Sequence, residues 1–76
     1  MATESIRSQL VEAFPGAEVS VVDRTGGGDH FQVSVVSSAF DGLSLVEQHR
    51  LVNAALAAQL ADGTIHELRI RTKGIA

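Results

Sequence analysis

The sequence predicts an α+β domain in which helices cover one face of a three-stranded sheet. Two observations support this: segments with apolar residues at helical spacing, and segments in which apolar and polar residues alternate. The order along the chain is helix, two strands, a helical region and a final strand. Because the chain has 76 residues, of which 45% are hydrophobic, we expect residues 1–76 to form a single domain.

The first helix is expected over residues 3–14, where Ile6 and Leu10 share one face and Thr3 is a suitable N-cap. A proline–glycine pair directly after this segment should end the helix, because proline cannot continue it and glycine accepts left-handed backbone angles.

Two strands are expected over residues 18–23 and 30–37, since apolar and polar residues alternate in both. The segment between them contains three consecutive glycines, which is typical of a flexible hairpin loop and not of a tight two-residue turn. Its exposed amides also suit an anion, but the Walker and G-x-G-x-x-G patterns are missing. A hairpin loop is therefore the favoured interpretation.

Ser44 and Glu47 form the sequence pattern of a capping box at the start of a second long helix. This helix is expected over residues 45–60, with an apolar stripe made by Leu45, His49, Val52, Leu56 and Leu60. The last strand is expected over residues 65–72. It follows a helical crossover, so it is expected to pair in parallel with a neighbour.

Composition excludes several classes of function. The net charge of −3 argues against a dedicated nucleic-acid binder, and the lack of cysteine excludes disulfides and thiolate ligands from this chain. No apolar run reaches the length of a membrane span, and no basic-then-apolar leader begins the sequence, so we expect a cytoplasmic protein. No nucleophile elbow or enclosed carboxylate pair is indicated, so we predict no catalytic residues and no enzyme activity.

Three histidines are the residues best suited to binding a transition metal. His49 lies in the apolar stripe, which favours a structural role, with its ring partly buried and hydrogen-bonded. His30 faces away from the core side of its strand, and His66 opens the last strand on the parity of Leu68. From spacing alone, His30 and His66 match no local metal motif and could meet only through the fold.

Together these segments resemble the BolA family. The resemblance covers residues 6–72 and rests on a glycine loop followed by His-Phe, a V-V-S-x-x-F-x-G segment, a Q-H-R-x-V helix and an I-H-x-L-x-I strand. It implies an α-β-β-α-α-β fold similar to a class II KH domain, with the additional short helix around residues 38–41.

The resemblance also implies a function. BolA-like proteins bind monothiol glutaredoxins, and the two proteins share a glutathione-linked two-iron two-sulfide cluster. The family's C-terminal ligand matches His66 and its variable loop ligand matches His30. Beside His30, we expect Gly27, Gly28 and Asp29 to bind the partner, because the glycines give the loop freedom to adjust when the partner docks. No cofactor is expected in the isolated protein.

The sequence departs from the family pattern at its end. Many members continue with a segment that contains tryptophan, whereas this chain ends at Ala76 and has no tryptophan. Partner contacts made by that segment are therefore not carried over. A regulator that binds nucleic acid through the KH-like fold is the alternative function, which the acidic charge and the absence of a G-x-x-G clamp between helices make the weaker one.

Overall fold

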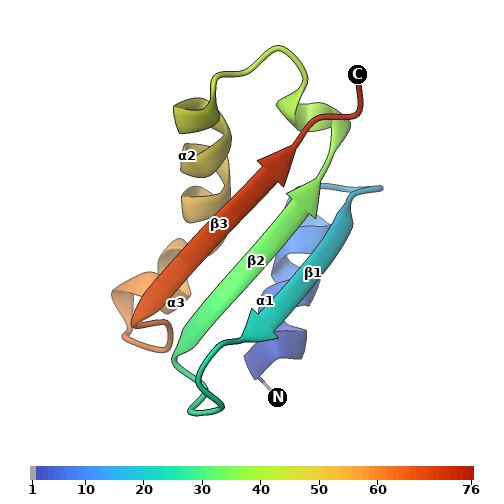
Figure 1. The fold of residues 1–76 in the computed structure, drawn as a ribbon. Coiled ribbons are helices and arrows are strands. Elements are labelled where there is room, and N and C mark those ends of the chain that lie inside the picture. The colour runs from blue at the N-terminus through green and yellow to red at the C-terminus, as the bar shows by residue number, and fades with distance from the viewer. Residues whose placement is uncertain (1) are drawn as a thin grey trace.

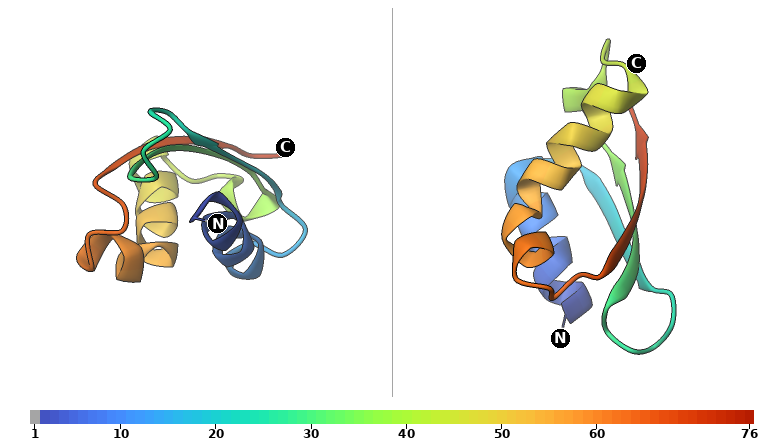
Figure 2. Two further views of the ribbon diagram at one scale, coloured as in Figure 1. Left: turned by 90° about the horizontal axis from the view of Figure 1, so that it is seen from below. Right: turned by 90° about the vertical axis from the view of Figure 1, so that its left-hand side faces the viewer.

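The computed structural model describes residues 2–76 as three strands that form a single mixed sheet (Figure 1). Strand β2 lies in the centre, antiparallel to β1 and parallel to β3. The helices lie together on one face of the sheet and leave the other face open (Figure 2). The elements are α1 (Ala2–Ala13), β1 (Glu18–Asp23), β2 (His30–Val36), the 3₁₀ helix η1 (Ser38–Phe40), α2 (Leu45–Ala55), α3 (Ala57–Ala61) and β3 (Glu67–Lys73). The predicted α+β architecture is confirmed.

The hydrophobic core lies between the sheet and the helices. Strand β2 alternates strictly between buried and half-buried residues, because one of its faces meets the helices and the other faces outward. The edge strand β3 contributes residues that are only half-buried, such as Leu68 and Ile70. The buried hydrophobic residues are Ile6, Leu10, Phe14, Phe31, Val33, Val35, Phe40, Val52, Leu56 and Ile65.

Helix α1 begins earlier than the sequence predicted. Thr3 lies inside the helix, so its assignment as the N-cap is wrong. The end is as expected: the amide of Ala17 donates to the carbonyl of Phe14 at 3.0 Å, and Gly16 takes a φ of 81° that favours glycine.

The capping box at the start of α2 is confirmed. The Ser44 hydroxyl accepts the Glu47 amide at 3.2 Å, and the Ser44 amide donates to the Glu47 carboxylate at 3.2 Å. Leu45, the first residue of the helix, is 61% exposed, so its place in the apolar stripe is wrong.

The single helix predicted over residues 45–60 is divided in two. Leu56 has φ of −108° and ψ of 15°, which interrupts the helix between α2 and α3 while its side chain stays fully buried. Helix breaks usually occur at proline or glycine, but this segment contains neither, so the residue types do not indicate the break.

Leu56 offers a direct test of how the helices pack on the sheet. Its exposed fraction is 0%, so Leu56→Ala should lower the free energy of unfolding by about 2–5 kcal/mol. The matched control is Leu45→Ala, which removes the same atoms at an exposed position and should change stability by about 0.5 kcal/mol or less. Urea denaturation measures both; equal losses for the two variants would contradict the packing described.

Candidate metal-ligand site

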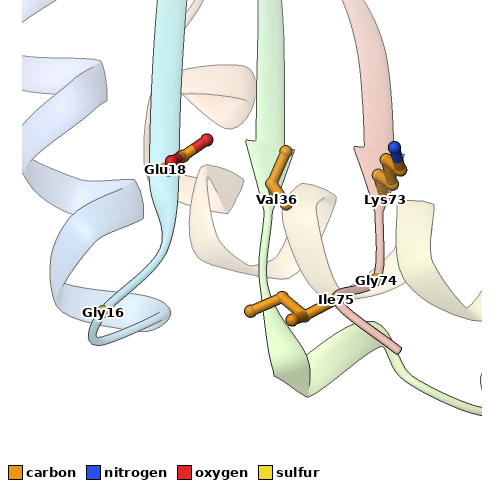
Figure 3. A pocket seen from close by; sticks show the side chains of 6 residues that line it. All are labelled: Gly16, Glu18, Val36, Lys73, Gly74 and Ile75. Atoms are coloured by element: carbon orange, nitrogen blue, oxygen red, sulfur yellow. The ribbon is translucent and has the colours of Figure 1, made fainter.

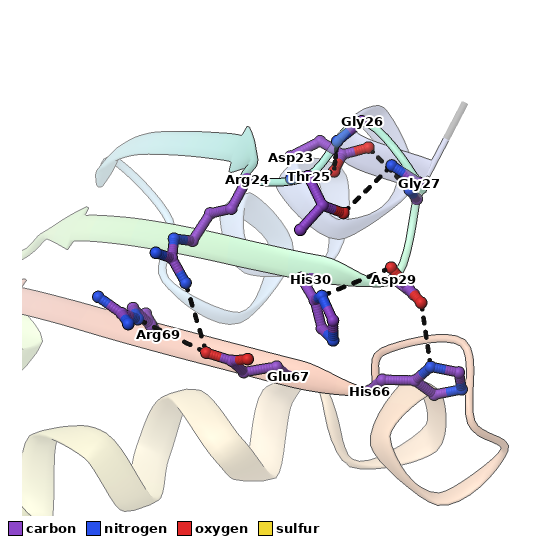
Figure 4. A network of polar contacts seen from close by, with 11 residues as sticks. Asp23, Arg24, Thr25, Gly26, Gly27, Asp29, His30, His66, Glu67 and Arg69 are labelled. Atoms are coloured by element: carbon purple, nitrogen blue, oxygen red, sulfur yellow. Dashed lines mark hydrogen bonds and ion pairs between the residues drawn. The ribbon is translucent and has the colours of Figure 1, made fainter.

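His30 and His66 lie side by side at one end of the sheet, although they are far apart in sequence (Figure 4). Their ring centroids are 6.5 Å apart and the rings are inclined by 62°. His30 is the first residue of β2, and His66 directly precedes β3. The side chain of His66 is 62% exposed and that of His30 is 35% exposed, so both rings are accessible from outside.

The parallel pairing of β2 with β3 brings the two histidines together. His30 is paired with Glu67 in the sheet, and the carbonyl of Asp29 accepts the amides of His66 at 2.8 Å and Glu67 at 3.2 Å. Since two consecutive amides share one carbonyl, regular strand geometry starts at Glu67. The predicted start at Ile65 is therefore wrong, and His66 lies directly before the strand instead of within it.

The Asp29 side chain lies between the two rings. One oxygen, Oδ2, is 3.1 Å from Nδ1 of His66, and the other, Oδ1, is 3.8 Å from Nδ1 of His30. The first distance is that of a hydrogen bond and the second is too long for one. Asp29, expected only as part of a partner-binding loop, is thus hydrogen-bonded to His66 and lies beside His30.

Asp23 organises the glycine loop. Its carboxylate accepts the amides of Gly26 and Gly28, both at 2.9 Å, and that of Thr25 at 3.3 Å. Gly27 instead donates to the Thr25 hydroxyl at 3.2 Å. The hairpin loop is confirmed, and the amides that suited an anion are engaged by a carboxylate of the chain itself. An aspartate at the end of a strand, three residues before the first loop glycine, is a sequence pattern that could have indicated this contact, because aspartate side chains often accept amides a few residues on.

His49 lies elsewhere, on helix α2, with a half-buried side chain. Its backbone carbonyl accepts the Asn53 amide group at 3.1 Å. Among residues 2–76 no hydrogen bond to the His49 ring is found, so the ring contact expected from the sequence is not present. The site contains the other two histidines only.

The carboxylate of Glu67 is directed toward two arginines and away from the histidines (Figure 4). It lies 3.4 Å from Nη1 of Arg24 and 3.6 Å from Nε of Arg69. These groups are exposed, so the pairs contribute little to stability.

A shallow hollow with a volume of about 430 Å³ lies at the other end of the sheet (Figure 3). Glu18 and Lys73 stand on the two edge strands beside it, with Val36 of the central strand between them. Neither His30 nor His66 lines this hollow. Because imidazole is the side chain here best suited to binding a transition metal, the pair of histidines is the better candidate for a metal-binding site.

The chemistry of the pair fits an iron centre that is completed by another molecule. Imidazole nitrogen is a suitable iron ligand, and two histidines replace two thiolates on one iron in Rieske-type clusters. His30 and His66 offer two such nitrogens on accessible rings. Within residues 2–76 no group of three histidine or carboxylate side chains is placed to hold a metal ion.

Comparison with known proteins identifies the family. Residues 10–76 match the family described as BolA-like protein. The chain belongs to the BolA family. Human BolA-like protein 1 is 41% identical over 76 residues, a match that covers 91% of this chain and 55% of the human protein. This chain thus spans about half the length of that curated relative.

Solved structures of BolA-like proteins share the fold. BolA1 from Arabidopsis thaliana superimposes with a TM-score of 0.89 at 30% identity, over 99% of this chain and 93% of that one. The BolA domain of SufE1 from the same plant superimposes with a TM-score of 0.87 at 34% identity, over 96% of this chain and 91% of that one.

Over residues 2–76, none of the helices has the length and apolar character needed to cross a membrane.

Asp23 is expected to determine the conformation of the loop beside the site. Asp23→Ala should speed amide exchange at Gly26 and Gly28 about tenfold, because a hydrogen bond to a charged acceptor contributes about 1.5 kcal/mol or more. Amides in the middle of β2 should be unaffected. Asp62→Ala is the matched control, since Asp62 accepts a backbone amide in a different loop, from Thr64 at 2.8 Å. Unchanged exchange in Asp23→Ala would show that the glycine amides do not depend on this carboxylate.

Proposed function

We propose that this BolA-like protein is a non-enzymatic adaptor that binds a monothiol glutaredoxin. In the complex, His66 and His30 supply imidazole ligands to a glutathione-linked two-iron two-sulfide cluster, in iron–sulfur trafficking or iron regulation. The cluster is the shared cargo of the complex, and the isolated chain carries none. The cytoplasm is the proposed compartment.

The observation that carries this proposal is the meeting of two accessible histidines, 36 positions apart in sequence, at one end of the sheet. The ring centroids are 6.5 Å apart, so one external group can contact both rings. Surface histidines without a shared role are not expected to lie side by side. Both positions also match the ligand positions that the family resemblance implies.

The composition of the chain supports the need for a partner. It contains no cysteine, so any thiolate at a shared cluster has to come from the glutaredoxin and from glutathione. Two imidazoles provide two of the four terminal ligands of a two-iron two-sulfide cluster, whose sulfides bridge the two irons. A site of this kind is complete only at an interface.

The glycine loop is the proposed partner-facing segment beside the ligands. Gly27 and Gly28 bring backbone without side-chain bulk close to His30, and Asp29 connects the loop to His66 through a hydrogen bond. Because glycine has no side chain, the backbone of Gly27 and Gly28 allows a partner to approach closely next to the ligands.

One observation favours a second function, nucleic-acid binding. Arg69, Arg71 and Lys73 are exposed at alternate positions of β3, so they share the open face of the sheet. However, Arg69 and the neighbouring Arg24 face Glu67. The phenylalanines are all buried, so this face has no aromatic platform on which bases could stack. We therefore place this function second.

His66 is the main test of the proposal. His66→Ala should preserve the fold, because the side chain is largely exposed, while the mixed complex with a glutaredoxin, glutathione, iron and sulfide should lose its cluster or revert to the visible spectrum of the glutaredoxin alone. His30→Ala should have a weaker effect of the same kind. Visible absorption and electron paramagnetic resonance of the reduced complex measure both.

His49→Ala is the matched control, since it removes an imidazole outside the site. It should leave the spectra unchanged in the folded protein. If His66→Ala and the unmodified protein gave mixed complexes with identical visible and paramagnetic spectra, His66 would not be a ligand.

Fluorescence anisotropy with a labelled single-stranded oligonucleotide tests the second function. Little binding is expected at physiological salt, because the net charge of −3 repels phosphates and the β3 cations are few. Tight binding that is lost in Arg71→Ala would reverse the order of the two functions.

A further inference from the structure

Four carboxylates lie in the segments around the histidine pair, and they have different partners. Asp23 holds the glycine loop, and Glu67 faces two arginines. The hydroxyl of Thr64, and secondarily its amide, hydrogen-bond to Asp62 and lower the pKa of that carboxyl, so Asp62 is engaged within its own turn. Among the described residues, Asp29 is the carboxylate that contacts histidine rings.

The contacts of Asp29 with the two rings are unequal. Its Oδ2 lies 3.1 Å from Nδ1 of His66, within hydrogen-bond distance, whereas its Oδ1 is 3.8 Å from Nδ1 of His30. A carboxylate only accepts, so a neutral His66 ring must carry its proton on Nδ1 to make this bond. The lone pair of the neutral ring is then on Nε2, on the opposite side of the imidazole.

A glycine of the turn after α3, Gly63, lies beside Nε2. Gly63 has a φ of +82°, and a Cβ built at this position would lie 4.0 Å from Nε2 of His66. Glycine at this position places no side chain of its own beside that nitrogen. The His66 side chain is also the more exposed of the two histidines.

We infer that Asp29 is a positioning residue that holds neutral His66 in the Nδ1-protonated tautomer, which leaves Nε2 unprotonated as the ligand atom. His30 lacks such a bond and can rotate to complete the site. The inference rests on the proposed ligand role of His66. A carboxylate that accepts the second N–H of a ligating histidine fixes ring orientation and raises ligand basicity, and its loss typically weakens metal binding about 10–100-fold.

The tautomer can be measured on the isolated protein, without metal or partner. Long-range ¹H–¹⁵N correlation spectra, recorded at a pH at which imidazole is neutral, distinguish a protonated Nδ1 from a protonated Nε2. The unmodified protein should show His66 protonated on Nδ1, and Asp29→Ala should abolish that preference. The Asp29 carbonyl that supports the strand is retained in the variant, so the fold should be kept.

Two further variants separate the hydrogen bond from charge. Asp29→Asn keeps an acceptor oxygen without the charge and should retain much of the Nδ1-protonated form. Glu67→Gln removes a neighbouring negative charge that does not contact the rings and should change nothing. A His66 tautomer that is the same in Asp29→Ala as in the unmodified protein would overturn the inference, as would an equal effect of Glu67→Gln.

Titration with Zn²⁺ alone, followed through the His66 ring signals, tests the consequence for metal binding. Asp29→Ala should bind Zn²⁺ about 10–100-fold more weakly than the unmodified protein, and Glu67→Gln should bind it equally well. Equal affinity in Asp29→Ala would contradict the positioning role. A His66 ring that does not respond to Zn²⁺ in the unmodified protein would instead contradict its role as a ligand, whatever its tautomer.

Discussion

The parallel pairing of β3 with β2 is the constraint on which both the core and the histidine site depend. A shift of one residue in this register would turn Leu68 and Ile70 away from the helices and displace His66 by about 3.3 Å along the strand. The burial of apolar side chains thereby fixes the position of a polar ring that is itself exposed. The Asp29 carbonyl, which accepts the amides of both His66 and Glu67, sets the point at which this pairing begins.

The sequence predicted the parts of the fold that depend on local chemistry. Alternation identified the strands, and the Ser44–Glu47 pair marked the start of α2 correctly. The break at Leu56 was not predicted, because it arises in tertiary packing and no glycine or proline marks it. The start of β3 was placed two residues early, since the shared carbonyl of Asp29 comes from a segment far away in sequence.

The two histidines of the candidate site could be chosen from the sequence, but their arrangement in space could not. His30 and His66 could be singled out as residues suited to binding a metal, and family resemblance paired them, but no spacing rule brings together residues so far apart. The contact of Asp29 with His66 was out of reach of sequence reasoning, because it depends on how the chain enters β3. Two aspartates at opposite ends of one loop thus differ in role: Asp23 binds backbone amides, and Asp29 contacts rings.

The separation of the histidines along the chain has a consequence for the newly made protein. Non-local strand pairing is slow to form because loop-closure entropy opposes it until the core is assembled. Before that point the two rings are independent, and the unfolded chain does not hold both imidazoles near one metal ion. A molecule that binds both rings at once therefore selects the native state and adds its binding free energy to folding stability. Because the two rings meet only when β3 pairs with β2, a group that binds both rings at once can bind only to folded chains.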